Sequence, residues 1–362
     1  MRRSSILLSV LILGLGAAAP LLAADSTRTL RVELSDPSRP FAVENLAGRM
    51  TVVAGSGRSV VAVATVHAES ADLAEAISFA EVAGTDGRPT LRVRYPLADY
   101  GRIKYSDAGQ DSGFLSLFDG NSNTSTRYDG YKVKVSSSGS GVAMWADVEV
   151  QVPSSGIDAT FKNVVGRVSA ADVAGTLSFD TGSGDIDLQR LSGSVEADTG
   201  SGDVNAASCR GSIDCDTGSG DCRITDFDGD RIAGGVGSGD IIIRSGTARE
   251  VDLNTGSGDI VVEGAEVEKF TAGTGSGDIV FETDSPRLAS IDADTGSGDV
   301  TLRLGAGASF VAHADQGSGD IVCRFSDAEA IMQRREVVGY RRGGEQIRID
   351  VDTGSGDLVI EQ

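Results

Sequence analysis

In the second half of the chain, apolar residues alternate with polar ones on both sides of a recurring glycine-rich segment, Thr-Gly-Ser-Gly-Asp. Its Gly-Ser-Gly-Asp core occurs nine times, at successive spacings of 18, 18, 19, 19, 19, 21, 21 and 37 residues. The nine cores end at Asp185, Asp203, Asp221, Asp240, Asp259, Asp278, Asp299, Asp320 and Asp357. A fixed period of this length is typical of proteins built from stacked repeats.

Large apolar residues precede every copy, eight positions before the aspartate in most of them: Leu177, Val195, Ile213, Ile232, Val251, Phe270, Ile291, Val311 and Ile349. Further apolar or small residues follow one and three positions after it, as Ile241 and Ile243 follow Asp240. A period of two on both sides of a glycine turn predicts strand, tight turn, strand, and the glycines exclude a helix. A lone hairpin cannot bury its apolar face, whereas stacked copies can. We therefore predict an all-β fold, a β-solenoid with rungs of about 18–21 residues.

The rest of the chain divides into a leader and a β-rich start. Residues 1–24 carry Arg2 and Arg3, an apolar run and a small-residue cleavage site, which predicts a secretory signal peptide. Residues 25–147 are expected to begin the solenoid, with one short helix at 70–79 as a connector or end cover and a polar loop or hairpin insertion at 97–141. Residues 148–362 form the regular solenoid, and 157–174 align with the next period as a degenerate first rung.

A second insertion, residues 326–344, accounts for the last long interval between repeats. Asp327 as a cap and the spacing of Ala328, Ile331, Met332 and Val338 predict a short helix. Because an open solenoid end invites uncontrolled strand pairing, we expect this insertion to cover one end.

Net charge restricts the partners. The chain has 53 acidic and 32 basic residues, and removal of Arg2 and Arg3 with the leader would leave 30 basic residues and a charge of −23. This balance argues against nucleic acid and anionic membrane surfaces as partners. No stretch after the leader is long and apolar enough for stable membrane insertion.

Two positions after the aspartate, the side chain should point outward, yet the later copies carry β-branched residues there. We call this set the outward stripe: Ile242, Val261, Val280, Thr301, Val322 and Val359. One interpretation is strand propensity on an ordinary surface. The interpretation we favour is a covered or partner-binding surface, with the 326–344 insertion packed on part of it.

The nine repeat aspartates should form a column of like charges that needs compensation. Either each carboxylate accepts hydrogen bonds from N–H groups of the turns, or calcium lies between rungs, so all nine are also weak calcium candidates. Five Asp-Thr-Gly-Ser segments resemble the aspartic protease signature, but their structural period argues against a catalytic pair. We expect no catalytic residues, no cofactor and no enzyme activity.

Four cysteines, Cys209, Cys215, Cys222 and Cys323, fall mostly at inward positions. Buried thiols that pack as small apolar groups are one interpretation, and a disulfide between Cys215 and Cys222 across one turn is the other.

The segments Phe41-Ala-Val-Glu-Asn and Val148-Glu-Val-Gln-Val-Pro153, followed by serial Thr-Gly-Ser-Gly-Asp-Ile, resemble the DUF4097 family of bacterial envelope proteins, which are often named as adhesins. The resemblance implies an extracytoplasmic β-solenoid, periplasmic, secreted or on the cell surface. Its expected function is adhesin-like or scaffold binding of an envelope protein or glycan. The alternative is an envelope-stress accessory protein that senses or signals to a membrane regulator.

Overall fold

The computed structural model describes residues 26–34, 39–84, 87–105, 123–344 and 346–362. The predicted signal peptide therefore lies outside the described residues. The chain forms two compact units, 1–187 and 188–362, which we call the first and second units. Their described secondary structure is almost entirely strand, with one six-residue helix, so the all-β prediction is confirmed. In the part of the chain that is described, no helix is long and apolar enough to span a membrane.

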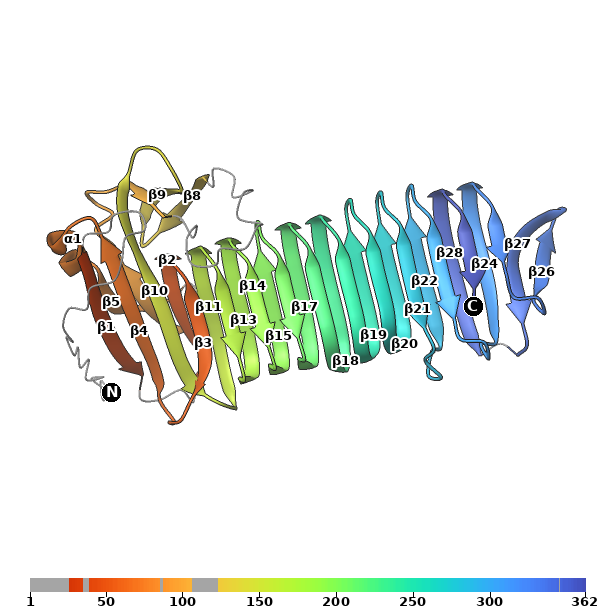
Figure 1. Cartoon of the computed structure of the whole chain (residues 1–362), viewed down its shortest axis with the longest axis horizontal. Coiled ribbons are helices and arrows are strands. Elements are labelled where there is room, and N and C mark those ends of the chain that lie inside the picture. Colours follow the sequence, from red (N-terminus) through yellow and green to blue (C-terminus); the bar gives the residue numbers. More distant parts are fainter. Residues whose placement is uncertain (1–25, 35–38, 85–86, 106–122, 345) are drawn as a thin grey trace. The chain divides into compact units, whose positions relative to one another are not determined.

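The described residues of the first unit form thirteen strands and the helix α1 (Ala71–Ala76), which is labelled in Figure 1. The strands are β1 (Ser26–Leu34), β2 (Phe41–Ala47), β3 (Met50–Gly55), β4 (Val60–Ala68), β5 (Ser78–Ala83), β6 (Pro89–Arg94), β7 (Arg102–Lys104), β8 (Asn123–Tyr128), β9 (Tyr131–Ser136), β10 (Val142–Pro153), β11 (Ile157–Val165), β12 (Val168–Ala171) and β13 (Ala174–Ser183). β14 (Ile186–Gln189) crosses the boundary between the units.

Parallel rungs begin earlier in the first unit than the glycine motif does. β2 and β3 form one rung and pair in parallel register with β11 and β12, which form the next. The predicted degenerate rung at 157–174 is thus confirmed. Phe41, Phe161 and Phe179 are fully buried one rung after another, and the rings of Phe161 and Phe179 stack at 5.4 Å. These side chains supply the large apolar area that holds successive rungs together.

The remainder of the first unit differs from a simple solenoid start. β1 and β10 both pair antiparallel with β4, and β5 pairs antiparallel with β6. The predicted helix is present as α1: Ser70 caps its N-terminus by accepting from the Leu73 N–H, and Arg28 donates to the carbonyl of Glu75 at its C-terminal end. α1 lies against β1 and β4, as expected for an end cover. The 97–141 insertion contains the antiparallel hairpin β8–β9, and its residues 106–122 lie outside the described residues.

The second unit contains the regular repeats. Its strands are β15 (Ser192–Thr199), β16 (Val204–Ala207), β17 (Arg210–Ser219), β18 (Cys222–Ser238), β19 (Ile241–Thr255), β20 (Ile260–Thr274), β21 (Ile279–Thr283), β22 (Ser290–Thr295), β23 (Val300–Leu304), β24 (Phe310–Ser318), β25 (Ile321–Cys323), β26 (Glu329–Gln333), β27 (Glu336–Arg342), β28 (Ile347–Ser355) and β29 (Leu358–Glu361).

Apolar positions of the repeats lie in register and point into one interior, as predicted. Ile213 pairs with Ile232, and Val251 with Phe270, and all four are buried. The prediction is wrong at one position: Val311 is half-buried, and Ala312 takes the inward place opposite Ile349. The preceding Phe310, which is fully buried, fixes that register because neighbouring side chains of a strand alternate between faces.

The last repeat of the sequence is not the last in space. β28 pairs on one side with β22 and on the other with β24, and β29 lies in the same way between β23 and β25. Figure 1 shows β28 between β22 and β24 at the blue end of the chain. The rung of residues 347–361 is therefore inserted between the two rungs that precede it in sequence.

The helix predicted within residues 326–344 is wrong. This insertion forms the antiparallel hairpin β26–β27, and β27 pairs antiparallel with β24 (Figure 1). β24 would otherwise leave a row of unpaired backbone groups, and that requirement overrides a helical spacing of apolar residues. The insertion does cover a strand edge, as expected, but it covers β24 with the strand β27 and not with a helix.

Candidate binding surface

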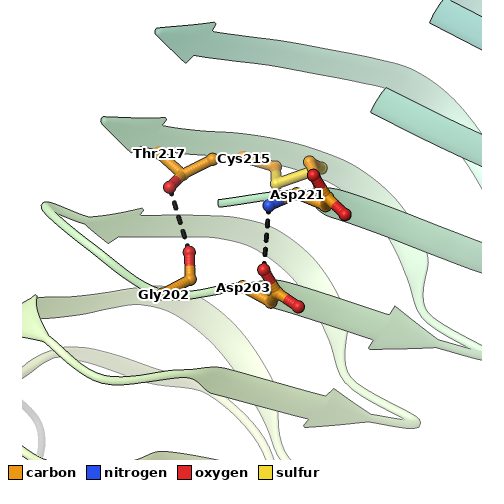
Figure 2. Close-up of a disulfide and its surroundings, with 6 residues drawn as sticks. Gly202, Asp203, Cys215, Thr217 and Asp221 are labelled. Carbon is orange, nitrogen blue, oxygen red and sulfur yellow. Dashed lines mark hydrogen bonds between the residues drawn. A yellow bond between two sulfur atoms is a disulfide. The ribbon is translucent and has the colours of Figure 1, made fainter. Parts of the chain in front are cut away.

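Neighbouring Gly-Ser-Gly-Asp corners of the second unit are bonded to each other through their aspartates. Oδ1 of Asp203 accepts from the backbone N–H of Asp221 at 2.9 Å, as Figure 2 shows, and Asp221 accepts from Asp240 in the same way. The series continues at 2.8–2.9 Å through the remaining rungs: Asp240, Asp259, Asp278, Asp299, Asp357 and Asp320. We call this column the aspartate ladder. Hydrogen bonds to charged acceptors are stronger than neutral ones, so the ladder helps to fix the spacing of the turns.

The threonine and the glycines of the motif complete the corner. Oγ1 of Thr217 donates to the carbonyl of Gly202 in the preceding rung at 3.0 Å (Figure 2), and Thr274 does the same to Gly258. A Cβ at Gly258 would lie 2.0 Å from the carbonyl oxygen of Gly239, which leaves no room for a side chain. In the first unit, the buried amide of Asn163 takes the threonine's place and donates to the carbonyls of Gly48 and Gly166.

The ladder bonds account for part of the charge compensation that the sequence called for. They run between rungs, not within one turn as in an Asx-turn. Arginines add to them in the early rungs: Arg223 pairs with Asp203 at 2.9 Å and also with Asp221, and Arg167 of the first unit pairs with Asp185 at 3.1 Å. Among the described residues, no group of three or more Asp, Glu, His or Cys side chains has a geometry suited to a metal ion. Calcium binding by the nine aspartates stays a prediction.

Of the two interpretations of the cysteines, the structure has the disulfide between Cys215 and Cys222, drawn in yellow in Figure 2. The bridge joins the strand before one corner to the strand after it. Cys209 is a buried thiol, as the other interpretation expected, and Cys323 is a half-buried one. Burial raises the pKa of both thiols, so they are poor nucleophiles at neutral pH.

The six residues of the outward stripe form one continuous column. Ile242 pairs with Val261, Val261 with Val280, and Val280 with Thr301. Because the last rung is inserted, Val359 follows Thr301 and Val322 comes last. Val322 is 37% exposed and the other five are half-buried.

Charged residues border the stripe on both sides. Two positions before it in each rung runs the aspartate ladder. Two positions after it runs a ladder of opposite charges, in which Glu263 pairs with Arg244 and Arg303 joins Glu282 to Glu361. The hydrogen bond from Arg303 and the charge of Arg324 lower the pKa of the Glu361 carboxyl. Since this second ladder neutralises itself, the surface offers an apolar line between an acidic row and an internally paired row.

The 326–344 insertion reaches only the end of the outward stripe: β27 contacts β25, the strand that carries Val322, and the Tyr340 hydroxyl donates to the carbonyl of Ile321 at 3.5 Å. Val322 nevertheless stays 37% exposed, so the expected cover over the stripe is limited to this contact. The stripe lies on the strands that follow the corners, whereas β27 pairs with β24, a strand that precedes one. The hairpin instead leans over the outer face of the preceding strands and bounds a cleft of about 440 Å³ there. Four of its lining residues are the aspartates Asp292, Asp315, Asp350 and Asp352, and the others include His313, Gln333 and Val338. The sequence did not predict this cleft, because nothing in the repeat indicated where the hairpin would lean.

The Toastrack DUF4097 family model matches residues 147–361, more than half of the chain. The chain belongs to this family. The match includes all nine glycine corners and confirms the resemblance read from the repeats, together with the β-solenoid fold. No curated protein matches the chain.

Two solved structures are similar to this Toastrack chain. One is a "putative cell adhesion protein" from Clostridium sporogenes, with 10% identity, 93% of this chain and 100% of the other covered, and a TM-score of 0.23. The other is a "putative lipid binding protein" from Parabacteroides distasonis, with 13% identity, 92% and 96% covered, and a TM-score of 0.40.

Proposed function

We propose that this Toastrack protein is a non-enzymatic binding protein that works outside the cytoplasm and presents its outward stripe to an envelope protein or a glycan. The observation that carries the proposal is the unbroken column from Ile242 to Val322. Surface strands of a soluble protein usually alternate apolar-in with polar-out, and the early rungs do so with Asn205 and Arg223. A change to β-branched residues over six adjacent rungs favours recognition over chance.

The state of the described charged residues around the stripe supports a binding role. Its charged neighbours are engaged: ladder carboxylates accept backbone N–H groups, and the arginines beyond the stripe pair with glutamates. Such groups hold a surface in place and are poorly suited to transferring protons. The signal-peptide pattern of residues 1–24 and the disulfide both favour an oxidising compartment.

Retention of the purified protein by isolated cell envelopes tests the proposal. Replacing Val261, Val280 and Val359 together by Ser keeps small side chains on half-buried positions and removes the apolar contact. We expect retention, measured by quantitative immunoblot, to fall about tenfold, equivalent to a loss of ~1.4 kcal/mol.

The matched control changes two half-buried valines away from the stripe, Val311 and Val338, to Ser. Circular dichroism melting should show both variants folded. If the envelopes retain the stripe variant and the control variant equally, the proposed function is rejected.

A further inference from the structure

The second unit ends in an open strand edge. β26 pairs with β27 on one side, and within the described part of the chain no strand pairs with its other side. Natural proteins protect such edges with lysine, proline or an inward charge. The segment Glu329-Ala-Ile-Met-Gln333 has no lysine or proline, and its one charge, Glu329, is already paired with Arg341. Met332 on this edge is 57% exposed, more than Tyr131 or Val322.

The turn of the same hairpin has an unusual composition. Arg334 and Arg335 occupy its two central positions with φ angles of 52° and 79°. Positive φ at both positions is a turn geometry that ordinarily selects Asn-Gly. Both arginines are exposed and, among the described residues, neither has an ion pair, whereas the nearby Arg341 and Arg342 pair with Glu329 and Asp327. The turn therefore presents two positive charges that the rest of the described unit does not neutralise.

The edge is complementary to itself. Acidic residues, Asp327 and Glu329, stand at its start, and the basic pair, Arg334 and Arg335, stands at its end. If two copies of β26 pair antiparallel about Ile331, each Ala330 lies opposite Met332 of the other copy. The same register brings Asp327 of each copy beside Arg335 of the other, so the charge match occurs twice.

We propose that β26 is a homodimer interface, in which a second copy of this chain adds its own β26 antiparallel about Ile331. This pairing satisfies the open backbone groups, covers Met332 and brings Arg335 beside the Asp327 carboxylate, which Arg342 of its own chain also contacts. The edge is short, so the contact is smaller than a standard interface and the dimer is in exchange with monomer, with a dissociation constant on the order of 10–100 µM.

Sedimentation equilibrium of the full chain up to about 0.5 mM measures this association. Met332→Lys places a charge on an exposed edge position without touching the core and should leave the protein monomeric. Tyr131→Lys, at a 45% exposed tyrosine of the first unit, is the matched control and should dimerise like the wild type. A wild type that stays monomeric, or a dimer that Met332→Lys leaves unchanged, overturns the proposal.

Charge and register are tested separately. Arg335→Glu should weaken the dimer at least fivefold, and adding Asp327→Arg to the same chain should restore it by exchanging the two charges.

In a Cys323→Ala background, mixing an Ala330→Cys chain with a Met332→Cys chain should yield a disulfide-linked dimer that neither chain forms alone. If the chains associate but this cross-link does not form in the mixture, the register is rejected and with it this interface. That outcome is expected if another face mediates the contact or if the edge binds a strand of a different protein.

Discussion

At the residue scale, each recurring position of the corner has one physical task. The threonine donates to a glycine carbonyl, the second glycine allows the close approach of the preceding turn, and the aspartate accepts the next turn's N–H, as Thr274, Gly258 and Asp259 illustrate. The turn itself was predictable from the glycines and the apolar period. The partners of the aspartates were not, because they depend on which rung comes next: Asp299 bonds to Asp357, 58 residues away.

Steric crowding at the corner predicts a large effect of one added methyl group. A Cβ at Gly277 would lie 2.0 Å from the carbonyl oxygen of Gly258, whereas a Cβ at Gly307 would meet nothing within 4 Å. Neither glycine has a left-handed φ, so the comparison isolates the contact. We expect Gly277→Ala to lower the free energy of unfolding by about 3 kcal/mol and Gly307→Ala to change it by less than about 0.5 kcal/mol. Urea unfolding measures both, and similar small losses would show that the corner is not tightly packed.

At the element scale, the strands and their inward faces followed from the sequence, but two arrangements did not. The spacing of Ala328, Ile331 and Val338 fits a helix as well as it fits a twisted hairpin, and only the open backbone of β24 decides between them. Likewise, a repeat carries no mark of its place in the stack, so residues 347–361 could not be assigned to an inner position. The six stripe residues were identified from the sequence, and their spatial order was not.

Because β29 lies between two other strands, a substitution in its buried face should lower the free energy of unfolding as much as one in the core. Ile360 stands two residues from the end of the sequence, yet it is fully buried and pairs with Leu302 on one side and Cys323 on the other. We expect Ile360→Ala to cost about 3 kcal/mol in chemical unfolding, as at any core position, whereas Val359→Ala at the half-buried neighbour costs under about 1 kcal/mol. Comparable small costs would indicate a frayed end and contradict the inserted rung.

At the scale of the whole molecule, the excess of acidic residues is organised by the repeats. Besides the aspartate ladder, the strands before the corners carry outward carboxylates: Asp198 and Asp216 lie in register, as do Asp294 and Asp352. Burial and the neighbouring Asp214 and Asp198 raise the pKa of Asp216. These rows carry part of the negative charge that argues against nucleic acid as a partner. Composition alone could not show that the ladder Oδ1 atoms accept backbone N–H groups.

The hydrogen bonds accepted by the ladder Oδ1 atoms predict how calcium affects the thermal stability of the protein. Because Oδ1 of each inner ladder aspartate is already bonded to the next rung, we expect the thermal midpoint to be the same in millimolar calcium and in chelator, within about 1 °C. Magnesium at equal ionic strength controls for charge screening. A calcium-specific rise that Asp259→Asn with Asp278→Asn removes would establish a metal site and overturn the expectation.

The inserted last rung has a consequence for how the protein matures. A solenoid whose rungs follow chain order can grow from one end as it leaves the ribosome or the translocon. Here the rung of residues 310–323 has no final neighbour until residues 347–361 have been made, and the nearest template before then is the exposed side of residues 290–304. Pairing there would have to be undone to admit residues 347–361, so these rungs assemble out of chain order, and a slow folding phase should report the rearrangement.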